Sequence, residues 1–207
     1  MAKRTAEEAE QTRRTILRTA QALFSERGFA ATRTIDIART SGFSEGAVFH
    51  HYPDKTLLFR AVVDRLQQLY VADIYETAMR EDDPMRRFLN GTRRSLELSI
   101  NSDYLRIVML EAGVVLGATG WREMDARVGL SLIEPNLIAV SGRDDLPEAQ
   151  IKPMALMVMG LVNETIYALA RGDGGVSIDG TIILLERATN DWIARLGPMP
   201  HQSTQQA

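Results

Sequence analysis

The sequence predicts an all-α protein. Apolar residues recur at three- and four-residue intervals along most of the 207 residues, which is the spacing of residues on one face of a helix. No segment alternates Val, Ile or Thr with polar residues over the length of a strand. Glycines, prolines and short polar side chains divide the periodic segments into successive helices.

The first part of the chain predicts three helices followed by a longer one. Gly28 ends the first helix and Pro53 the third, because a glycine favours a helix C-terminus and a proline cannot continue a helix. The link between the second and third helices is Ser41-Gly42-Phe43-Ser44. The expected helices cover about residues 16–27, 34–41, 45–51 and 54–79.

The remaining chain predicts five more helices. Pro84 suits the first turn of one helix, and Asn101, Ser102 and Asp103 form a stop that also caps the next. Residues 198–207 carry Pro, Gln and Ser, and we expect a disordered tail there. The expected helices cover about residues 84–100, 104–115, 121–140, 152–170 and 177–196.

Composition excludes several classes of protein. Cysteine is absent, which excludes disulfides and thiolate metal sites. The N-terminal residues have no apolar core of signal-peptide length, and no run of about eighteen uncharged apolar residues predicts a membrane span. We therefore expect a cytoplasmic protein that makes no membrane contact.

Charge is distributed unevenly along the chain, although the net charge is only −3. Residues 1–60 contain ten Lys and Arg against seven Asp and Glu, whereas residues 61–207 contain fourteen against twenty. Attraction to phosphate would therefore be local to the N-terminal part. Charge alone does not favour nucleic-acid binding.

The second and third helices have the features of a helix-turn-helix. Gly42 can take the positive φ of a sharp turn, and Ser44 is placed to cap the third helix. Ile37 and Val48 can point into a small core with Phe24. Such a rigid corner can project its second helix into a DNA major groove, although an ordinary helical hairpin fits the same pattern.

Residues 10–65 closely resemble the DNA-binding domain of the TetR family of repressors. The resemblance implies a homodimer with a three-helix DNA-binding domain and a larger helical domain for ligand binding and dimerisation. We therefore expect domains at residues 10–70 and 71–197. The matched positions are Ile16, Ala20, Phe24, Gly28-Phe29, Thr32, Ile37-Ala38, Gly42-Phe43-Ser44, Gly46, His51-Tyr52 and Lys55.

By position, the resemblance also implies the residues that contact DNA. Arg33, Thr34 and Lys55 would contact phosphate at the starts of two helices, where the helix dipole favours an anion. The residues expected to face the groove are Ser44, Glu45, Gly46, Ala47, Phe49 and His50.

One position departs from the family pattern. Where the family usually has a tyrosine that meets a phosphate, this chain has Phe49, which cannot make that hydrogen bond. We expect Phe49 to stack on sugar or bases, or to support the helix. Glu45 could accept from cytosine and His50 could donate to guanine, but the operator sequence does not follow from so few base-reading side chains.

Metal binding and cofactor chemistry are not expected. His50, His51 and Asp54 are close in sequence, but neighbouring helical positions diverge by about 100°, so two adjacent histidines share one ion poorly.

An effector pocket is expected in the C-terminal part, among soft, aromatic and polar side chains. Asn163 is polar within a nearly all-apolar segment, so it needs a partner such as a ligand or a neighbouring helix. A plain hydrophobic core is the alternative for the apolar members. The pocket candidates are Phe88, Met109, Leu110, Val114, Trp121, Met124, Met157, Asn163 and Tyr167.

The last two helices are apolar on more than one face, so we expect a second subunit to cover them. Gly160 would allow close approach of the partner, and pairing these helices between subunits is the family's usual arrangement. The interface candidates are Gly160, Leu161, Leu184, Leu185 and Trp192.

Together these features predict a homodimeric repressor that binds a pseudo-palindromic double-stranded operator and leaves it when a small-molecule effector binds. A helical ligand-binding or interaction protein without DNA binding is the alternative. An enzyme is not expected, because the chain has no Cys nucleophile, no Gly-rich phosphate loop and no convincing Ser-His-Asp set.

Overall fold

The computed structural model describes residues 2–100 and 102–196, and side chains from residue 5 onwards. Over these residues the chain is helical and contains no strand, which confirms the predicted all-α class. Asn101 and the predicted disordered tail lie outside the described residues. The helices are α1 (Ala2–Ala31), α2 (Thr34–Ser41), α3 (Glu45–His51), α4 (Lys55–Ala78), α5 (Pro84–Ser99), the π-helix η1 (Tyr104–Glu111), α6 (Ala112–Val115), α7 (Ala118–Ser141), α8 (Glu148–Ala170) and α9 (Ile178–Arg195).

Helix ends follow the chemistry of their terminal residues. Ser44 caps α3 by accepting from the Ala47 amide at 3.2 Å, as the sequence predicts. Asp83 caps α5 from the residue before Pro84 in the same way. Gly28 has φ 81° and ψ 165°, so it breaks the helical path of α1 where the sequence predicts an end, and one more turn follows it.

The expected helix at 104–115 differs from the prediction. Residues Tyr104–Glu111 form a π-helix, and only Ala112–Val115 are α-helical. Asp103 does not cap this helix, because its carboxylate binds side chains of α1 instead. The Ser102 hydroxyl accepts from the Leu105 amide at 3.2 Å in its place.

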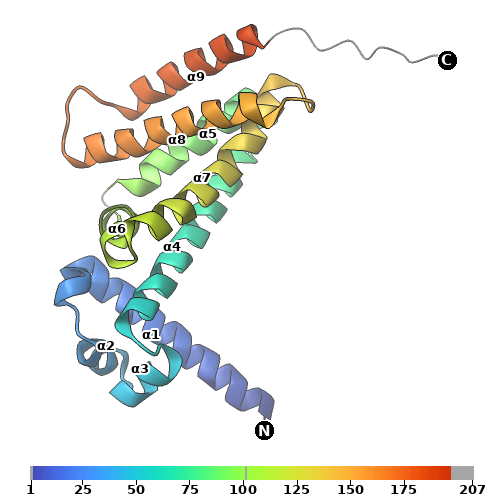
Figure 1. The fold of residues 1–207 in the computed structure, drawn as a ribbon. Helices are drawn as coiled ribbons and strands as arrows, with labels where there is room; N and C mark the ends of the chain where they lie inside the picture. Colours follow the sequence, from blue (N-terminus) through green and yellow to red (C-terminus); the bar gives the residue numbers. More distant parts are fainter. Residues whose placement is uncertain (1, 101, 197–207) are drawn as a thin grey trace.

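The molecule is elongated, with α1, α2 and α3 at one end and α5 to α9 at the other (Figure 1). Helix α4 runs between the two ends, so the expected domain boundary at residues 70 and 71 falls inside a continuous helix. We call α1 to α3 with the first turn of α4 the head, and α5 to α9 with η1 the body. Helices α8 and α9 lie side by side along one edge of the body (Figure 1).

Two apolar clusters hold the fold together. The first begins in the head at Phe24 and Phe59 and continues through Ile107 of η1 to Ile166 of α8. The second lies within the body and includes Leu137 of α7 and Leu185 of α9. The first cluster thus joins the head to the body through continuous side-chain packing.

Helix α8 meets the length and composition of a membrane span, although the sequence predicts none. It contains Lys152 and Glu164, and it packs against α5, α7 and α9 of its own chain. Its apolar composition is accounted for by an inner face in the core and an outer face that bears exposed apolar side chains.

Candidate functional sites: a helix-turn-helix surface and a body cavity

The corner between α2 and α3 is fixed by backbone hydrogen bonds. Gly42 adopts φ 79° in the left-handed region. The amide of Phe43 donates to Ala38 at 3.0 Å and that of Gly42 to Arg39 at 3.3 Å, which is the Schellman pattern. The glycine and the capping Ser44 thus set the direction in which α3 leaves the turn.

Helix α3 exposes one face and buries another. Val48 is 1% exposed and anchors the helix in the head core. Phe49 is 44% exposed, which is unusual for an aromatic ring unless it meets a partner. Of the other expected groove residues, Ser44, Glu45, Gly46 and His50 are exposed and Ala47 is half-buried.

A carboxylate between two arginines organises the start of α2. Asp36 is buried and accepts from Arg33 at 2.9 Å and from Arg39 at 3.2 Å. The Arg33 guanidinium holds the pKa of Asp36 below its usual value. Both arginines remain exposed, so Asp36 presents two cations at the surface beside the half-buried Thr34. Sequence reasoning identified Arg33 but missed Arg39 and Asp36, although their spacing of three residues was visible.

Lys55 makes contacts within the head that the sequence did not predict. Its ammonium donates to the carbonyls of Phe29 at 2.9 Å and Thr32 at 3.0 Å, and lies 4.1 Å from the centre of the Phe29 ring. Two of its three N–H donors are therefore engaged inside the head. Lys55 fastens the end of α1 to the start of α4, and its third N–H donor is left for the expected phosphate contact, which stays a prediction.

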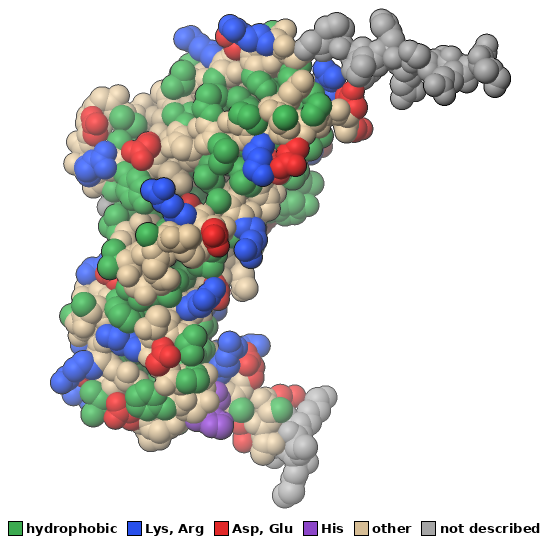
Figure 2. Space-filling view, in the orientation of Figure 1, with side chains coloured by type: hydrophobic (Ala, Val, Ile, Leu, Met, Phe, Trp, Pro, Cys, Tyr) green, Lys and Arg blue, Asp and Glu red, His purple; other side chains and the backbone are tan. Residues whose placement is uncertain are grey.

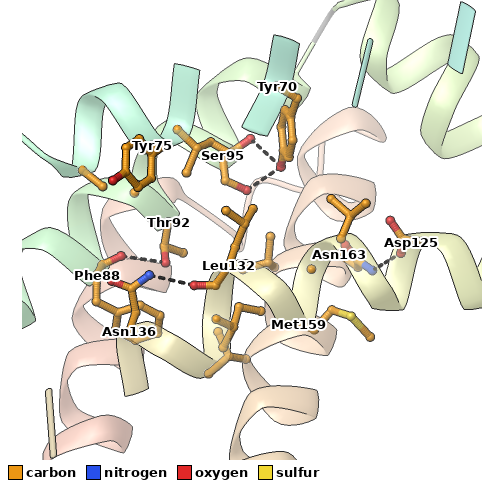
Figure 3. A pocket seen from close by; sticks show the side chains of 18 of the residues that line it. Tyr70, Tyr75, Phe88, Thr92, Ser95, Asp125, Leu132, Asn136, Met159 and Asn163 are labelled. Carbon is orange, nitrogen blue, oxygen red and sulfur yellow. Dashed lines mark hydrogen bonds between the residues drawn. The ribbon is translucent and has the colours of Figure 1, made fainter. Parts of the chain in front are cut away.

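The body contains a cavity of about 100 Å³ beneath α4. Its walls come from α4, α5, η1, α7 and α8 (Figure 3). Apolar residues make most of the wall, and polar groups are spaced among them. The apolar lining includes Ile74, Phe88, Met109, Val128, Leu132, Ile133, Val158, Met159 and Val162, and the polar lining includes Tyr70, Tyr75, Thr92, Ser95, Tyr104, Asp125, Asn136 and Asn163.

Three of the nine expected pocket residues line this cavity, namely Phe88, Met109 and Asn163. Tyr167 lies behind Met109 and donates to its carbonyl at 3.0 Å.

The other five lie outside the cavity, because their helices turn them towards solvent or towards other contacts. Leu110, Val114 and Met157 are 52%, 86% and 53% exposed. Trp121 is buried in the first apolar cluster, and Met124 borders a shallow groove between α4 and α7. Periodicity alone did not distinguish these orientations, in part because η1 does not follow the α-helical period.

The polar groups of the cavity mostly bind one another or the backbone. The Tyr70 and Ser95 hydroxyls are 2.6 Å apart, and the Asn136 amide donates to the Leu132 carbonyl (Figure 3). Asn163 donates to Asp125 at 3.3 Å. Burial raises the pKa of Asp125, and this hydrogen bond only partly opposes the shift.

Helix η1 joins the cavity to the head. Tyr104 and Met109 face the cavity, whereas Asp103 and Glu111 at the two ends of the helix contact α1. Asp103 accepts from Gln21 at 2.7 Å and from Ser25 at 2.5 Å. Asp103 and Glu111 were missed as functional candidates, because their partners lie about eighty residues away in sequence.

The Glu111 carboxylate lies beside the break in α1. It accepts from the Phe29 amide at 2.7 Å. A Cβ atom at Gly28 would lie 2.8 Å from that carboxylate, so a larger residue would have to displace the Glu111 side chain as well as adopt φ 81°. Gly28 is thus fitted to the contact between head and body.

The outer faces of α8 and α9 bear exposed apolar side chains, and green side chains gather over this part of the body in Figure 2. Of the expected interface residues, Gly160 and Leu184 are exposed, and Leu161 and Trp192 are half-buried. Leu185 does not lie where it was expected, at the dimer interface, because it is 1% exposed and packs in the second cluster of its own chain. The exposed set is Leu156, Met157, Gly160, Ile183 and Leu184.

Comparison with known proteins matches both ends of the chain to one family. Residues 16–62 match the model of the bacterial regulatory proteins of the tetR family, and residues 85–182 match a tetracyclin repressor-like C-terminal domain. The chain is therefore a helix-turn-helix transcriptional regulator. It belongs to the TetR family.

Curated relatives match only a part of the chain. The probable acrEF/envCD operon repressor of Escherichia coli K12 is 37% identical over 90 residues, which are 42% of this chain and 40% of that protein. Matches to curated relatives thus span about a third to two fifths of their length.

Solved structures resemble the whole fold. A TetR-family transcriptional regulator from Pectobacterium atrosepticum is 27% identical, with a TM-score of 0.64 over 89% of this chain and 93% of that one. AibR, solved with isovaleryl coenzyme A and operator DNA, is 18% identical, with a TM-score of 0.59 over 86% of this chain and 97% of AibR. At that identity the likeness to AibR concerns the fold alone.

Proposed function

We propose that the chain is a homodimeric repressor that binds a pseudo-palindromic operator and is released from it by a small-molecule ligand in the body cavity. The observation that carries this proposal is the path from the cavity through η1 to α1. In this proposal residues 10–70 bind DNA and residues 71–197 bind the ligand and dimerise, and the protein acts in the cytoplasm.

The DNA-binding part rests on the exposed face of α3 and the cations beside it. Glu45, Phe49 and His50 would meet base edges or sugars, while Arg33 and Arg39 would bind phosphates on either side. Support comes from the match of residues 16–62 to the bacterial regulatory proteins of the tetR family. Phe49 would stack or contact a thymine methyl, because it has no hydroxyl for a phosphate.

DNA binding is tested by fluorescence anisotropy with the intergenic DNA beside the protein's own gene and with a shuffled fragment of equal length. We expect affinity for the intergenic fragment to exceed that for the shuffled one by at least about a thousandfold. Equal affinity for the two fragments would contradict the proposal.

The dimer part rests on the apolar face of α8 and α9. Leu156, Met157, Ile183 and Leu184 are each about half exposed. A second copy packed on this face in an isologous arrangement would cover them. Two heads could then enter successive major grooves, with half-site centres about 34–36 Å apart.

Leu184→Glu tests the dimer, with Val114→Glu as the matched control because Val114 is exposed on α6, away from this face. Analytical ultracentrifugation should give a monomer for Leu184→Glu and a dimer for both the wild type and the control. A dimer of unchanged stability in Leu184→Glu would reject this interface.

Ligand release would work through a change at η1. A ligand that displaces Tyr104 or Met109 moves the helix whose ends hold α1 through Asp103 and Glu111. Because α4 lines the cavity and also begins in the head, it would turn at the same time and change the separation of the two heads. Release requires a ligand that binds this second geometry more tightly.

A further inference from the structure

The cavity contains one charged group, and that group has no counter-ion. Asp125 of α7 faces the cavity beside Asn163 of α8 (Figure 3). No described Lys, Arg or His lies within ion-pair distance of its carboxylate, and none lines the cavity. Two arginines of α5 are paired elsewhere, Arg94 with Asp73 and Arg93 with Asp179.

The hydrogen-bonding capacity left in the cavity is mostly that of acceptors. The Thr92 hydroxyl donates to Phe88, and the Asn136 amide donates to Leu132, so each keeps an oxygen free to accept. Asp125 receives one hydrogen bond, from Asn163, although an ionised carboxylate can accept about four. A ligand that donates hydrogen bonds would therefore find free acceptors at Asp125, Thr92 and Asn136.

Aromatic side chains also line the cavity. Tyr70 and Tyr104 stack at 4.0 Å between ring centres, and Phe88 and Tyr75 lie on the α4 and α5 side of the same cavity. The face of an aromatic ring attracts a cation, and the attraction is stronger where water is excluded. Asp125 also acts on both stacked tyrosines, since its charge contributes to raising their pKa values.

We propose that the cavity binds a small organic cation, an ammonium group on an apolar or aromatic body, with the Asp125 carboxylate as its counter-ion. Asn163 positions that carboxylate through its amide, and the apolar wall formed by Ile74, Val158 and Val162 takes the body of the ligand. An anionic ligand would meet Asp125 with no cation to offset the repulsion. This proposal names the ligand class for the regulator proposed above and rests on that function.

The size of the cavity limits the ligand. At about 100 Å³ it is smaller than the roughly 150 Å³ cavity that accepts benzene in another protein. A ligand as large as one ring with a short chain therefore enters only if the cavity walls move apart.

Isothermal titration of the full-length protein without DNA tests the charge preference with three probes of similar shape. These are 2-phenylethylamine, 2-phenylethanol and phenylacetate, which at pH 7.5 are a cation, a neutral molecule and an anion. We expect the amine to bind at least about tenfold more tightly than the alcohol, and phenylacetate to bind most weakly. Phenylacetate binding as tightly as the amine, or no binding of the amine, would overturn the proposal.

Two variants test whether the Asp125 carboxylate causes the preference for the amine. Asp125→Asn should reduce the affinity for the amine about tenfold and leave that for the alcohol unchanged. Glu123→Gln, which removes the same charge from an exposed position two residues away, should leave both affinities unchanged. An equal loss of amine binding in both variants would overturn the role of Asp125. Since DNA is absent from these titrations, failure of the regulator proposal would not alter their result.

Discussion

The head and the body differ in how completely their side chains are packed and paired. In the head, Phe24, Phe29 and Phe59 pack with ring centres 5.1 to 5.8 Å apart, and Lys55 and Asp36 are each held by two partners. In the body, helices surround a cavity and leave Asp125 with a single hydrogen bond. A DNA-reading surface needs a fixed shape, whereas a ligand site needs groups whose interactions are completed only when the ligand binds.

Equal truncations in the two regions should differ in cost, and this is the largest effect we expect. Phe24→Ala removes a fully buried ring that is packed on all sides and should lower the free energy of unfolding by about 4 kcal/mol. Phe88→Ala enlarges a cavity that already exists, so it should cost about 2 kcal/mol less. Urea denaturation measures both values. Equal losses would mean that the cavity wall is packed as tightly as the head.

Lys55→Ala should lower the stability of the protein by about 2 kcal/mol, because the ammonium binds two carbonyls that would otherwise lose their partner. Thermal unfolding measures the loss. The dependence of DNA affinity on salt should stay as in the wild type at temperatures where the variant is folded. A shallower salt dependence would instead confirm the phosphate contact that its position in the family implies.

Arg39→Ala should alter the salt dependence of DNA binding and leave the stability of the protein nearly unchanged. The Arg39 side chain is 77% exposed, so stability should change little, but loss of one phosphate contact should reduce the slope of log affinity against log salt by about 1. Anisotropy titrations at several salt concentrations give the slope. An unchanged slope would remove Arg39 from the DNA-binding surface.

Asp103→Asn should weaken the coupling between ligand binding in the body and DNA binding by the head. The amide keeps the shape of the side chain but weakens its hydrogen bonds to Gln21 and Ser25. We expect DNA affinity and ligand affinity, each measured alone, to stay within about threefold of the wild type. The factor by which ligand weakens DNA binding should fall about tenfold. An undiminished factor would mean that the coupling does not pass through Asp103.

The smallest expected effect is the dependence of stability on pH that Asp125 contributes. Burial raises the pKa of Asp125 in the folded protein above its ordinary value of 3.8, so ionisation destabilises the fold as the pH rises through the interval between the two values. Asp125→Asn should therefore melt a few degrees above the wild type at pH 7, and this difference should vanish below about pH 4. A constant difference across this range would show that the charge of Asp125 is not its cause.

The sequence was most informative where structure is determined locally. Helices α2 and α3, the turn at Gly42 and the Ser44 cap depend on residues within a few positions of each other, and they were predicted to within a residue. Helix α1 is longer than predicted, because it begins at Ala2 and not near residue 16. Beyond these local features, the resemblance to one family supplied the expected DNA contacts.

The cavity depends on interactions that sequence spacing does not encode. Asp125 and Asn163 meet across two helices, and Asp103 reaches Gln21 across about eighty residues. The π-helix also rotates side chains away from α-helical positions, which is one reason why Leu110 was expected in the pocket but lies in solvent. Sequence reasoning did single out Asn163, because an amide within an apolar helix needs a partner. That partner could be a ligand or a neighbouring helix.

The central claim is that occupancy of the body cavity controls DNA binding by the head. Val162→Phe tests it directly without any ligand, because the larger side chain would enter the cavity, and Val114→Phe at an exposed position on α6 is the matched control. In variants with an unchanged dimer, we expect Val162→Phe to weaken binding to the intergenic fragment about tenfold and Val114→Phe to leave it unchanged. Wild-type DNA affinity in a folded, dimeric Val162→Phe protein would contradict this account.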